Sequence, residues 1–452
     1  MTFKVFAIFL LSLSASFDLY AGTTESLTLP NGLKVILVEE HKAPVITFQV
    51  WYKVGARNET TGQTGLSHLL EHMMFKGTPK YGKGEFSKIV AKNGGTENAF
   101  TGRDYTAYFE NFAADRVDLA LVLEADRMQH LSLDPTEFLL EREVVKEERR
   151  TRTEDDPYAF LIEQLYAISF LTHPYRQPVI GWMGDLDRLT RDDAQRYYKQ
   201  HYAPQNATIV AVGDFDAKTL LSKIKTVFGT IPRGEAPSSF ALPVELPQRG
   251  ERRIRVVREA QLPFVFAAYH TPNHRSPDVY PLTVLAQILS GGKSARLYQS
   301  LVYQQQVALD AGGHYDGLTS DPDLFYIYAM AHPEQSSGQS QDVLERALQG
   351  EVDRLRSERV LDQALQKAKN QIEAEWVMGG DSNFNRAMQI GMAETTGASY
   401  GFVEHFVENI RKVTAEEVQR VAESYLTETN KSVGILVIPV ASKMGPLSGG
   451  VP

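Results

Sequence analysis

Along the chain, hydrophobic positions recur with the period of a strand in some segments and with the period of a helix in others. The same order of predicted strands and helices occurs twice. The corresponding segments are 45–56 with 263–274, the helical stretch around His68 with that around Ile288, 93–109 with 311–327, and 189–202 with 413–426. Chance periodicity is the alternative, but four matches in one order favour a duplication. The strands do not alternate strictly with helices. We therefore expect an α+β fold of two similar domains, each a mostly antiparallel sheet with helices packed on it.

A Pro-rich segment separates the two halves. Residues 233–250 have a composition that disfavours helix and suits an extended connection. We therefore expect an N-terminal domain at residues 22–232 and a C-terminal pseudo-repeat domain at residues 251–440. Residues 441–452 contain several Gly and Pro residues and are expected to form a flexible tail.

The first 21 residues have the features of a cleavable signal peptide. Lys4 precedes an apolar run at residues 5–13, and small residues then lead to a cleavage site after Ala21. The run is about half of the ~20 residues that a membrane-spanning helix needs, which favours cleavage over an uncleaved or lipid-anchored helix. No later segment reaches about 18 uninterrupted apolar residues. We expect an exported protein, periplasmic in a bacterium with two membranes, that has no membrane span.

The amino-acid composition limits the kinds of partner and of chemical site that the chain can have. The 452 residues are 43% hydrophobic and 23% charged, which provides for real cores and excludes wholesale disorder. A net charge of −9, spread along the chain, argues against a nucleic-acid partner. The absence of cysteine excludes disulfides, thiol nucleophiles and thiolate metal sites. A bound metal must therefore be held by His, Asp or Glu.

The segment 65–78 contains the motif His68-x-x-Glu71-His72. In a helix, two residues four positions apart lie on one face with Cβ atoms about 5–6 Å apart, so both imidazoles can bind one cation. Zinc accepts histidine nitrogen at about 2.0–2.1 Å. Glu71 lies beside them and is placed to act as a general base on the attacking water. Apolar neighbours predict a buried helix that ends near Gly77; the alternative is a pair of core histidines that only form hydrogen bonds.

A catalytic zinc usually has three protein ligands, so one more is needed. Without cysteine, the natural source is a carboxylate on the helix expected at 138–150. Glu141 and Glu148 are seven residues apart and share one face, so that one can ligate while the other orients a histidine N–H. The spacing does not choose between them. Glu143 and Glu147 are expected to face solvent.

His-x-x-Glu-His is the inverzincin signature, and the chain resembles the pitrilysin family of zinc peptidases, most closely the branch of mitochondrial processing peptidase and its bacterial relatives. The segments that carry the resemblance are LPNGLKVILVEEHKAPV, HLLEHMMFKGT, GGTENAFTGRDYTAYF, EREVVKEE and HPYRQPVIG, and they cover nearly all of the chain after the signal peptide. The resemblance implies that His68, His72 and Glu148 hold one zinc ion per chain. It implies that Glu141 supports the site and that Glu71 is the general base. It also implies that two units form a hollow chamber.

The segment TENAFTGRD adds a candidate for substrate binding. In the family, the matching residues form a sheet edge beside the metal, to which the substrate adds as a strand. Such binding uses main-chain hydrogen bonds and is therefore loosely sequence-specific. The resemblance makes Asn98, Ala99 and Phe100 the candidates. The alternative is an ordinary strand with Phe100 in the core.

The second half departs from the family pattern. Members that work alone usually carry an Arg and a Tyr, seven residues apart, that clamp the substrate and stabilise the oxyanion. Alignment on Leu301 places Val302 and Leu309 at these positions, and neither side chain can donate a hydrogen bond. Arg296 and Tyr298 are nearby substitutes. We therefore expect a heterodimer in which a related chain supplies the Arg–Tyr pair, with a homodimer as the second choice.

The sequence thus predicts an exported zinc endopeptidase that hydrolyses peptides or unfolded segments. The alternative is a non-catalytic peptide-binding or assembly scaffold subunit, for which the missing Arg–Tyr pair leaves room. A zinc-storage protein is disfavoured because the chain has 11 histidines and no His-rich tract.

Overall fold

The computed structural model describes residues 24–235, 242–333 and 340–439. The expected signal peptide at 1–21 and the expected tail at 441–452 lie outside the described residues, as does the middle of the expected linker at 233–250. The described parts of that linker form neither helix nor strand.

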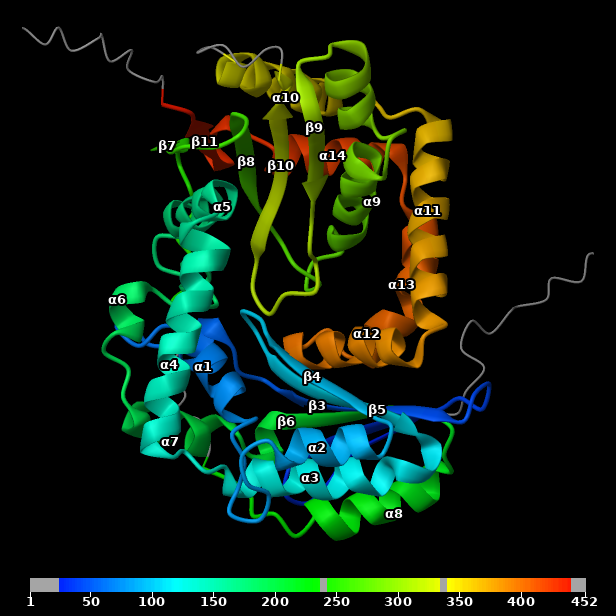
Figure 1. The fold of residues 1–452 in the computed structure, drawn as a ribbon. Coiled ribbons are helices and arrows are strands. Elements are labelled where there is room, and N and C mark those ends of the chain that lie inside the picture. The colour runs from blue at the N-terminus through cyan, green and yellow to red at the C-terminus, as the bar shows by residue number, and fades with distance from the viewer. Residues whose placement is uncertain (1–23, 236–241, 334–339, 440–452) are drawn as a thin grey trace, which may run out of the picture.

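The first half is built on a six-stranded sheet with the order β1-β2-β6-β3-β5-β4. Figure 1 labels β3, β4, β5 and β6 of this sheet. β2 and β6 are parallel, and the other neighbouring strands are antiparallel. The strands are β1 (Thr24–Thr28), β2 (Lys34–Glu39), β3 (Val45–Tyr52), β4 (Thr96–Thr101), β5 (Thr106–Ala113) and β6 (Ala207–Gly213). The helices are α1 (Leu66–Met73), α2 (Glu85–Lys92), α3 (Val117–His130), α4 (Pro135–Arg149), α5 (Pro157–Ser169), α6 (Met183–Leu186), α7 (Arg191–His201) and α8 (Ala217–Phe228).

The second half repeats this plan in a five-stranded sheet with the order β7-β11-β8-β10-β9. Here β7 and β11 are the parallel pair. The strands are β7 (Arg252–Val257), β8 (Phe264–Thr271), β9 (Ala308–His314), β10 (Asp323–Ala331) and β11 (Lys431–Val437). The helices are α9 (Val279–Ser290), α10 (Ser340–Ser357), α11 (Asp362–Gly380), α12 (Asn383–Thr396), α13 (Tyr400–Lys412) and α14 (Ala415–Tyr425). The predicted α+β fold of two similar, mostly antiparallel halves is confirmed.

One of the four sequence matches is shifted in the structure. Gly94 and Gly95 precede β4, whereas Gly312 and Gly313 lie inside β9, where they pair with β10. A glycine pair suits both a turn before a strand and a closely packed position within one, so aligning the two pairs does not fix the alignment of the strands. By contrast, α7 and α14 correspond closely, because each begins at a capping box, made by Thr190 in the first case and by Thr414 in the second.

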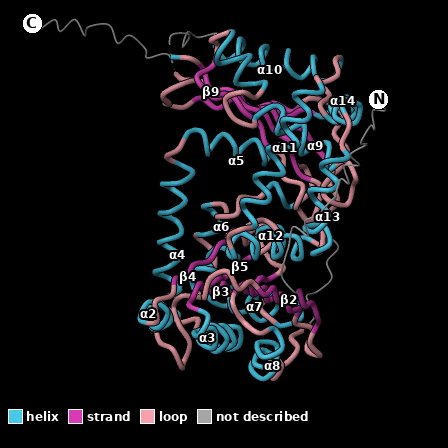
Figure 2. The backbone as a smooth tube through the Cα atoms, turned by 90° about the vertical axis from the view of Figure 1, so that its right-hand side faces the viewer, coloured by secondary structure: helices cyan, strands magenta, loops and turns pink. Residues whose placement is uncertain are grey.

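The two halves exchange helices. α5 belongs to the first half by sequence but packs on the second sheet, where Leu161 and Leu165 join a buried cluster with residues of β8 and β11. α12 belongs to the second half but packs on β3 and β6, and Ile390 there joins a cluster with Trp51. The tube view of Figure 2 shows α12 beside β3 and β5. Each half therefore completes the core of the other.

Polar contacts reinforce this junction. Lys34 of β2 forms an ion pair of 2.5 Å with Glu394 of α12. Arg57 donates to Asp321 at 2.8 Å, and His173 lies 3.2 Å from the same carboxylate. These contacts link residues of the first half to a loop and a helix of the second. Among the described residues, no helix has the length and apolar character needed to cross a membrane.

Candidate active site

Helix α1 carries the His-x-x-Glu-His motif on the side that faces away from the core. Leu69 and Leu70 are fully buried, and the helix therefore has one rotational setting in which its histidines point outward from the sheet. The N-terminus of α1 is fixed by Glu59, whose carboxylate accepts the backbone N–H groups of Gly65 and Ser67, each at 2.7 Å. This contact satisfies amides that a helix leaves unpaired at its start.

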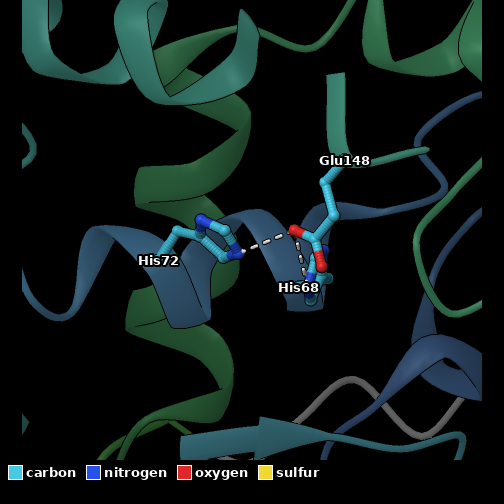
Figure 3. A group of neighbouring side chains, drawn as sticks. All are labelled: His68, His72 and Glu148. Carbon is cyan, nitrogen blue, oxygen red and sulfur yellow. Dashed lines mark ion pairs between the residues drawn. The ribbon is translucent and has the colours of Figure 1, made fainter. Parts of the chain in front are cut away.

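Three side chains from two helices converge at one point (Figure 3). The Nε2 atoms of His72 and His68 lie 3.4 Å and 3.8 Å from the same oxygen, Oε2 of Glu148. The three possible ligand atoms all lie within 4.8 Å of one another. Ligand atoms around a tetrahedral zinc lie about 3.3 Å apart, as bond lengths of about 2.0–2.1 Å require. The donor set and spacing of these residues therefore fit one zinc ion.

The protonation state of His68 suits a ligand. Burial, with smaller contributions from His72 and Arg152, lowers the pKa of His68 to about 3, so the imidazole is neutral at physiological pH. Its Nδ1 atom is buried and has no hydrogen-bond partner among the described residues. The ring is held by packing and by the approach of its Nε2 to Glu148, which is the arrangement that a metal ion between them would stabilise.

Glu141 lies behind His72, outside the group of three converging side chains. It accepts a hydrogen bond of 2.9 Å at Nδ1 of His72, opposite the Nε2 that faces Glu148, and it also pairs with Lys76. Although burial raises the pKa of Glu141, the hydrogen bonds from His72 and Lys76 lower it by more. A carboxylate in this place fixes the ring orientation and the tautomer of a ligating histidine. The structure thus brings Glu148 to the point of convergence and leaves Glu141 behind His72.

Glu71 points from α1 toward the edge strand β4. The hydroxyl of Thr101 donates to its Oε2 at 2.5 Å. Burial raises the pKa of Glu71, and the hydrogen bond from Thr101 acts in the opposite direction. A carboxylate that does not ligate but lies beside the ligands can accept and return a proton.

These residues open into a cavity of about 740 Å³. Asn98, Ala99 and Phe100 of β4 lie on its wall together with the motif residues. β4 is the last strand of its sheet, so one of its edges is unpaired within the described residues. The Ala99 amide is capped by the side chain of its neighbour Asn98 at 2.9 Å. Phe100 also packs on Trp51 at a centroid distance of 5.3 Å, so it is a core contact and a wall residue at once.

Other walls of the cavity were not predicted from the sequence. They come from α5 and from the segment 176–180, for which the resemblance implied no role. Thr101, Lys76 and Glu59 were also missed as partners of the motif. Thr101 and Glu59 follow no helical or strand period relative to the motif, and tertiary packing alone brings them there. Lys76 lies four residues after His72, a helical spacing that could have identified it.

The second half contributes no side chain to the cavity among the described residues, because the lining residues run from His68 to Ile180. Val302 packs against the core of the second half, and Leu309 is exposed on β9. Arg296 forms a hydrogen bond of 2.7 Å with Glu351 in its own half. The substitutes Arg296 and Tyr298 are thus absent from the cavity wall.

Sequence comparison identifies the family to which this fold belongs. The family model "Insulinase (Peptidase family M16)" matches residues 34–181, and "Peptidase M16 inactive domain" matches residues 188–372. The chain belongs to peptidase family M16, the pitrilysin family of zinc peptidases.

Two relatives illustrate this. The zinc protease PqqE of Helicobacter pylori is 30% identical over 95% of this chain and 97% of its own length. The uncharacterized zinc protease YmxG of Bacillus subtilis is 24% identical over 89% of this chain and 95% of its own length.

Solved structures show the same fold. A protease from Helicobacter pylori superposes with a TM-score of 0.86 at 30% identity, over 92% of this chain and 99% of that one. A peptidase M16 inactive domain from Pseudomonas fluorescens has a TM-score of 0.83 at 17% identity, over 93% of this chain and 99% of that one, which shows the fold alone. The first half of the periplasmic protease PqqL from Escherichia coli has a TM-score of 0.74 at 15% identity, over 92% of both chains.

Proposed function

We propose that the chain is a zinc-dependent endopeptidase that hydrolyses peptides or unfolded segments. The observation that carries this proposal is the convergence of His68, His72 and Glu148 beside Glu71, inside a cavity bounded by an open strand edge. In this proposal the three converging side chains hold one zinc ion per chain. When bound, zinc polarises the scissile carbonyl and makes water a stronger nucleophile at neutral pH.

The chain's own residues supply the proton transfers. The carboxylate of Glu71 accepts a proton from the attacking water and passes it to the leaving amine. The Thr101 hydroxyl holds that carboxylate at 2.5 Å and fixes its orientation. Glu141 keeps the Nδ1 of His72 occupied, so that its Nε2 remains available as a ligand atom.

The open edge of β4 binds the substrate in this proposal. An extended peptide adds beside Asn98, Ala99 and Phe100 and pairs with the backbone of β4. The Ala99 amide then exchanges its contact with the Asn98 side chain for a substrate carbonyl. Main-chain pairing explains acceptance of varied sequences, whereas the cavity walls select side chains.

A related chain completes the site by supplying an Arg and a Tyr. The absence of second-half residues from the described cavity wall supports this step, as do the apolar side chains of Val302 and Leu309. A heterodimer is proposed first and a homodimer second. We also propose export after cleavage of residues 1–21, which places the protein in the periplasm or outside the cell.

The test is hydrolysis of a quenched fluorescent peptide by the zinc-loaded chain, alone and mixed with a related chain that carries the Arg–Tyr pair. A Glu71→Gln variant serves as the blank. The proposal predicts turnover in the mixture that the blank lacks. Turnover by the chain alone would refute the shared site but keep the peptidase. A zinc-loaded chain that stays inactive in both settings would indicate the scaffold role instead.

A further inference from the structure

One cation on the cavity wall has no carboxylate within hydrogen-bond or ion-pair distance, although Asp323 and Asp104 attract it from further away. Arg103 follows the edge strand β4 and lines the same cavity as the motif. Among the residues that the structure describes, its side chain forms no hydrogen bond or ion pair, and its Nε is buried without a partner. A guanidinium remains charged at any physiological pH, and a half-buried one without a partner is costly.

The other charged side chains on this wall form hydrogen bonds or ion pairs. Glu163 is held by two hydrogen bonds of 2.7 and 2.9 Å from Arg149. Arg152 pairs with Glu148 at 2.5 Å. Arg176 is exposed and donates to the Leu171 carbonyl at 2.9 Å. Arg103 is thus the arginine on the described part of the wall that forms neither a hydrogen bond nor an ion pair.

The orientation of Arg103 is fixed by an aromatic ring. Its Cζ lies 4.0 Å from the centroid of Tyr166 of α5, a stacking distance. Ala159 and Ile162 of the same helix line the cavity next to this ring. A flat guanidinium that stacks on a ring keeps its edge N–H groups free, and that edge matches a carboxylate in bidentate geometry.

We propose that Arg103 and Tyr166 form a subsite for a carboxylate of the bound peptide, which deepens the proposed function and rests on it. The carboxylate comes from an acidic side chain or from the peptide C-terminus. The subsite selects among peptides that β4 alone would accept equally, because main-chain pairing does not read side chains. Arg103 is in this account a specificity-determining residue.

The experiment measures binding, so that it does not depend on turnover. The zinc-loaded full chain with Glu71→Gln is titrated into fluorescent peptides of one sequence that carry Glu, Gln or Lys at a single position moved along the peptide. A second set has a free or an amidated C-terminus. We expect the Glu peptide, or the free-acid peptide, to bind about 10-fold tighter than its neutral counterpart, as charge-assisted hydrogen bonds allow.

Variants test whether the preference for acidic peptides depends on Arg103. Arg103→Gln is expected to make the acidic and neutral peptides bind equally while the neutral peptide keeps its affinity, and Arg103→Lys to restore part of the preference. Arg176→Gln, which removes another arginine of the cavity wall, is the matched control and is expected to retain the preference for acidic peptides. In a purely structural role, Arg103 would serve only to attract the buried carboxylate of Asp323. Asp323→Asn tests this alternative and is expected to retain the preference for acidic peptides.

The outcomes separate the two proposals. Binding of all peptides without an acidic preference, a preference that survives Arg103→Gln, or its loss in Arg176→Gln or Asp323→Asn would overturn the subsite and leave the peptidase standing. Failure of every peptide to bind, both to the chain alone and to its mixture with a related chain that carries the Arg–Tyr pair, would overturn the proposed function itself. Thermal unfolding of each variant confirms that it is folded before binding is compared.

Discussion

The two halves of the molecule place equivalent helix pairs on equivalent sheets, yet they differ in what these helices carry. In the first half, α1 and α4 bring His68, His72 and Glu148 together. In the second half, α9 and α11 also contact each other, but α9 carries Gln287 near its end and is followed by Gly291. The side-chain amide of Gln287 donates a hydrogen bond to the carboxylate of Glu375 of α11 at 3.3 Å.

The difference shows that the fold does not need the first-half cluster. An amide paired with a carboxylate connects the helices of the second half, whereas the first half contains two half-buried imidazoles, one of them with an unsatisfied Nδ1. Half-buried polar groups that are unpaired destabilise a fold. A cluster that the other half lacks is therefore explained by function, and metal binding is the function that its geometry fits.

The largest expected effect comes from the base. Glu71→Gln keeps the shape of the side chain but cannot accept a proton, and peptide turnover is expected to fall about 10²–10⁴-fold, a typical general-base contribution. Zinc content should stay unchanged. Glu147→Gln, an exposed position on α4, is the control and should keep full activity. Normal turnover by Glu71→Gln would show that the base lies elsewhere.

The next largest effect is expected from removing a proposed zinc ligand of the first half and the matched carboxylate of the second half. Glu148→Gln is expected to abolish zinc retention after gel filtration, whereas the matched Glu375→Gln in the second half should retain one zinc per chain. Because a metal that binds the folded state stabilises it, zinc should raise the melting temperature of the wild type and of Glu375→Gln, but not of Glu148→Gln. Equal zinc content in the two variants would remove the basis of the comparison.

A smaller effect is expected at the carboxylate behind His72. Glu141→Gln keeps a hydrogen-bond acceptor at the ring Nδ1 but loses the negative charge, so zinc affinity should fall about 10–100-fold without being abolished. Competition with a zinc-binding dye measures this. If Glu141→Gln lost zinc as completely as Glu148→Gln, the two carboxylates would have been assigned to the wrong roles.

The exchanged helices can be compared through two glycines. A Cβ at Gly391 of α12 would lie 2.0 Å from the Trp51 ring, whereas at Gly434 of β11 it would lie 3.2 Å from Leu161 of α5. Gly391→Ala is expected to destabilise the protein by about 1–3 kcal/mol through overpacking. Gly434→Ala should cost less, because a leucine side chain can shift. Denaturant unfolding measures both, and the opposite order would contradict the packing described for this junction.

The cores behind the sheets differ as well. The first half buries Glu110, Glu124 and Arg127 where the second half buries Ala329 and Leu344. Burial, and then the neighbouring Glu124, raise the pKa of Glu110 above its ordinary value of 4.5. Glu97 on β4 lies directly opposite Glu110, Phe48 pairs with it from β3, and Arg127 on α3 donates to it at 3.2 Å.

This raised pKa has a consequence for stability. From about pH 4.5 upward the folded state holds a proton at Glu110 that the unfolded state has lost, so the free energy of unfolding falls as pH rises through this window. The slope is at most about 1.4 kcal/mol per pH unit for one proton. Glu110→Gln should flatten it in denaturant titrations at several pH values. An unchanged slope in the variant would show that Glu110 is ionised in the fold.

Much of the fold followed from periodicity. The helix at His68 and the strands at 45–56 and 263–274 have local patterns that packing did not overturn. The helix exchange could not be predicted, because α5 and α12 have apolar residues that would suit either sheet. The site was predictable where spacing within a helix sets it, as for His68 and His72. Thr101 and Arg103 reach the site through sheet pairing and tertiary contacts, which leave no period in the sequence.

The central claim is most directly tested by locating the metal. Crystals of the full chain grown with zinc would be measured at the zinc absorption edge, where anomalous scattering marks the ion. The account predicts one peak per chain, bonded to Nε2 of His68, Nε2 of His72 and the carboxylate of Glu148. A chain without a peak there, or with its peak between Gln287 and Glu375, would contradict it.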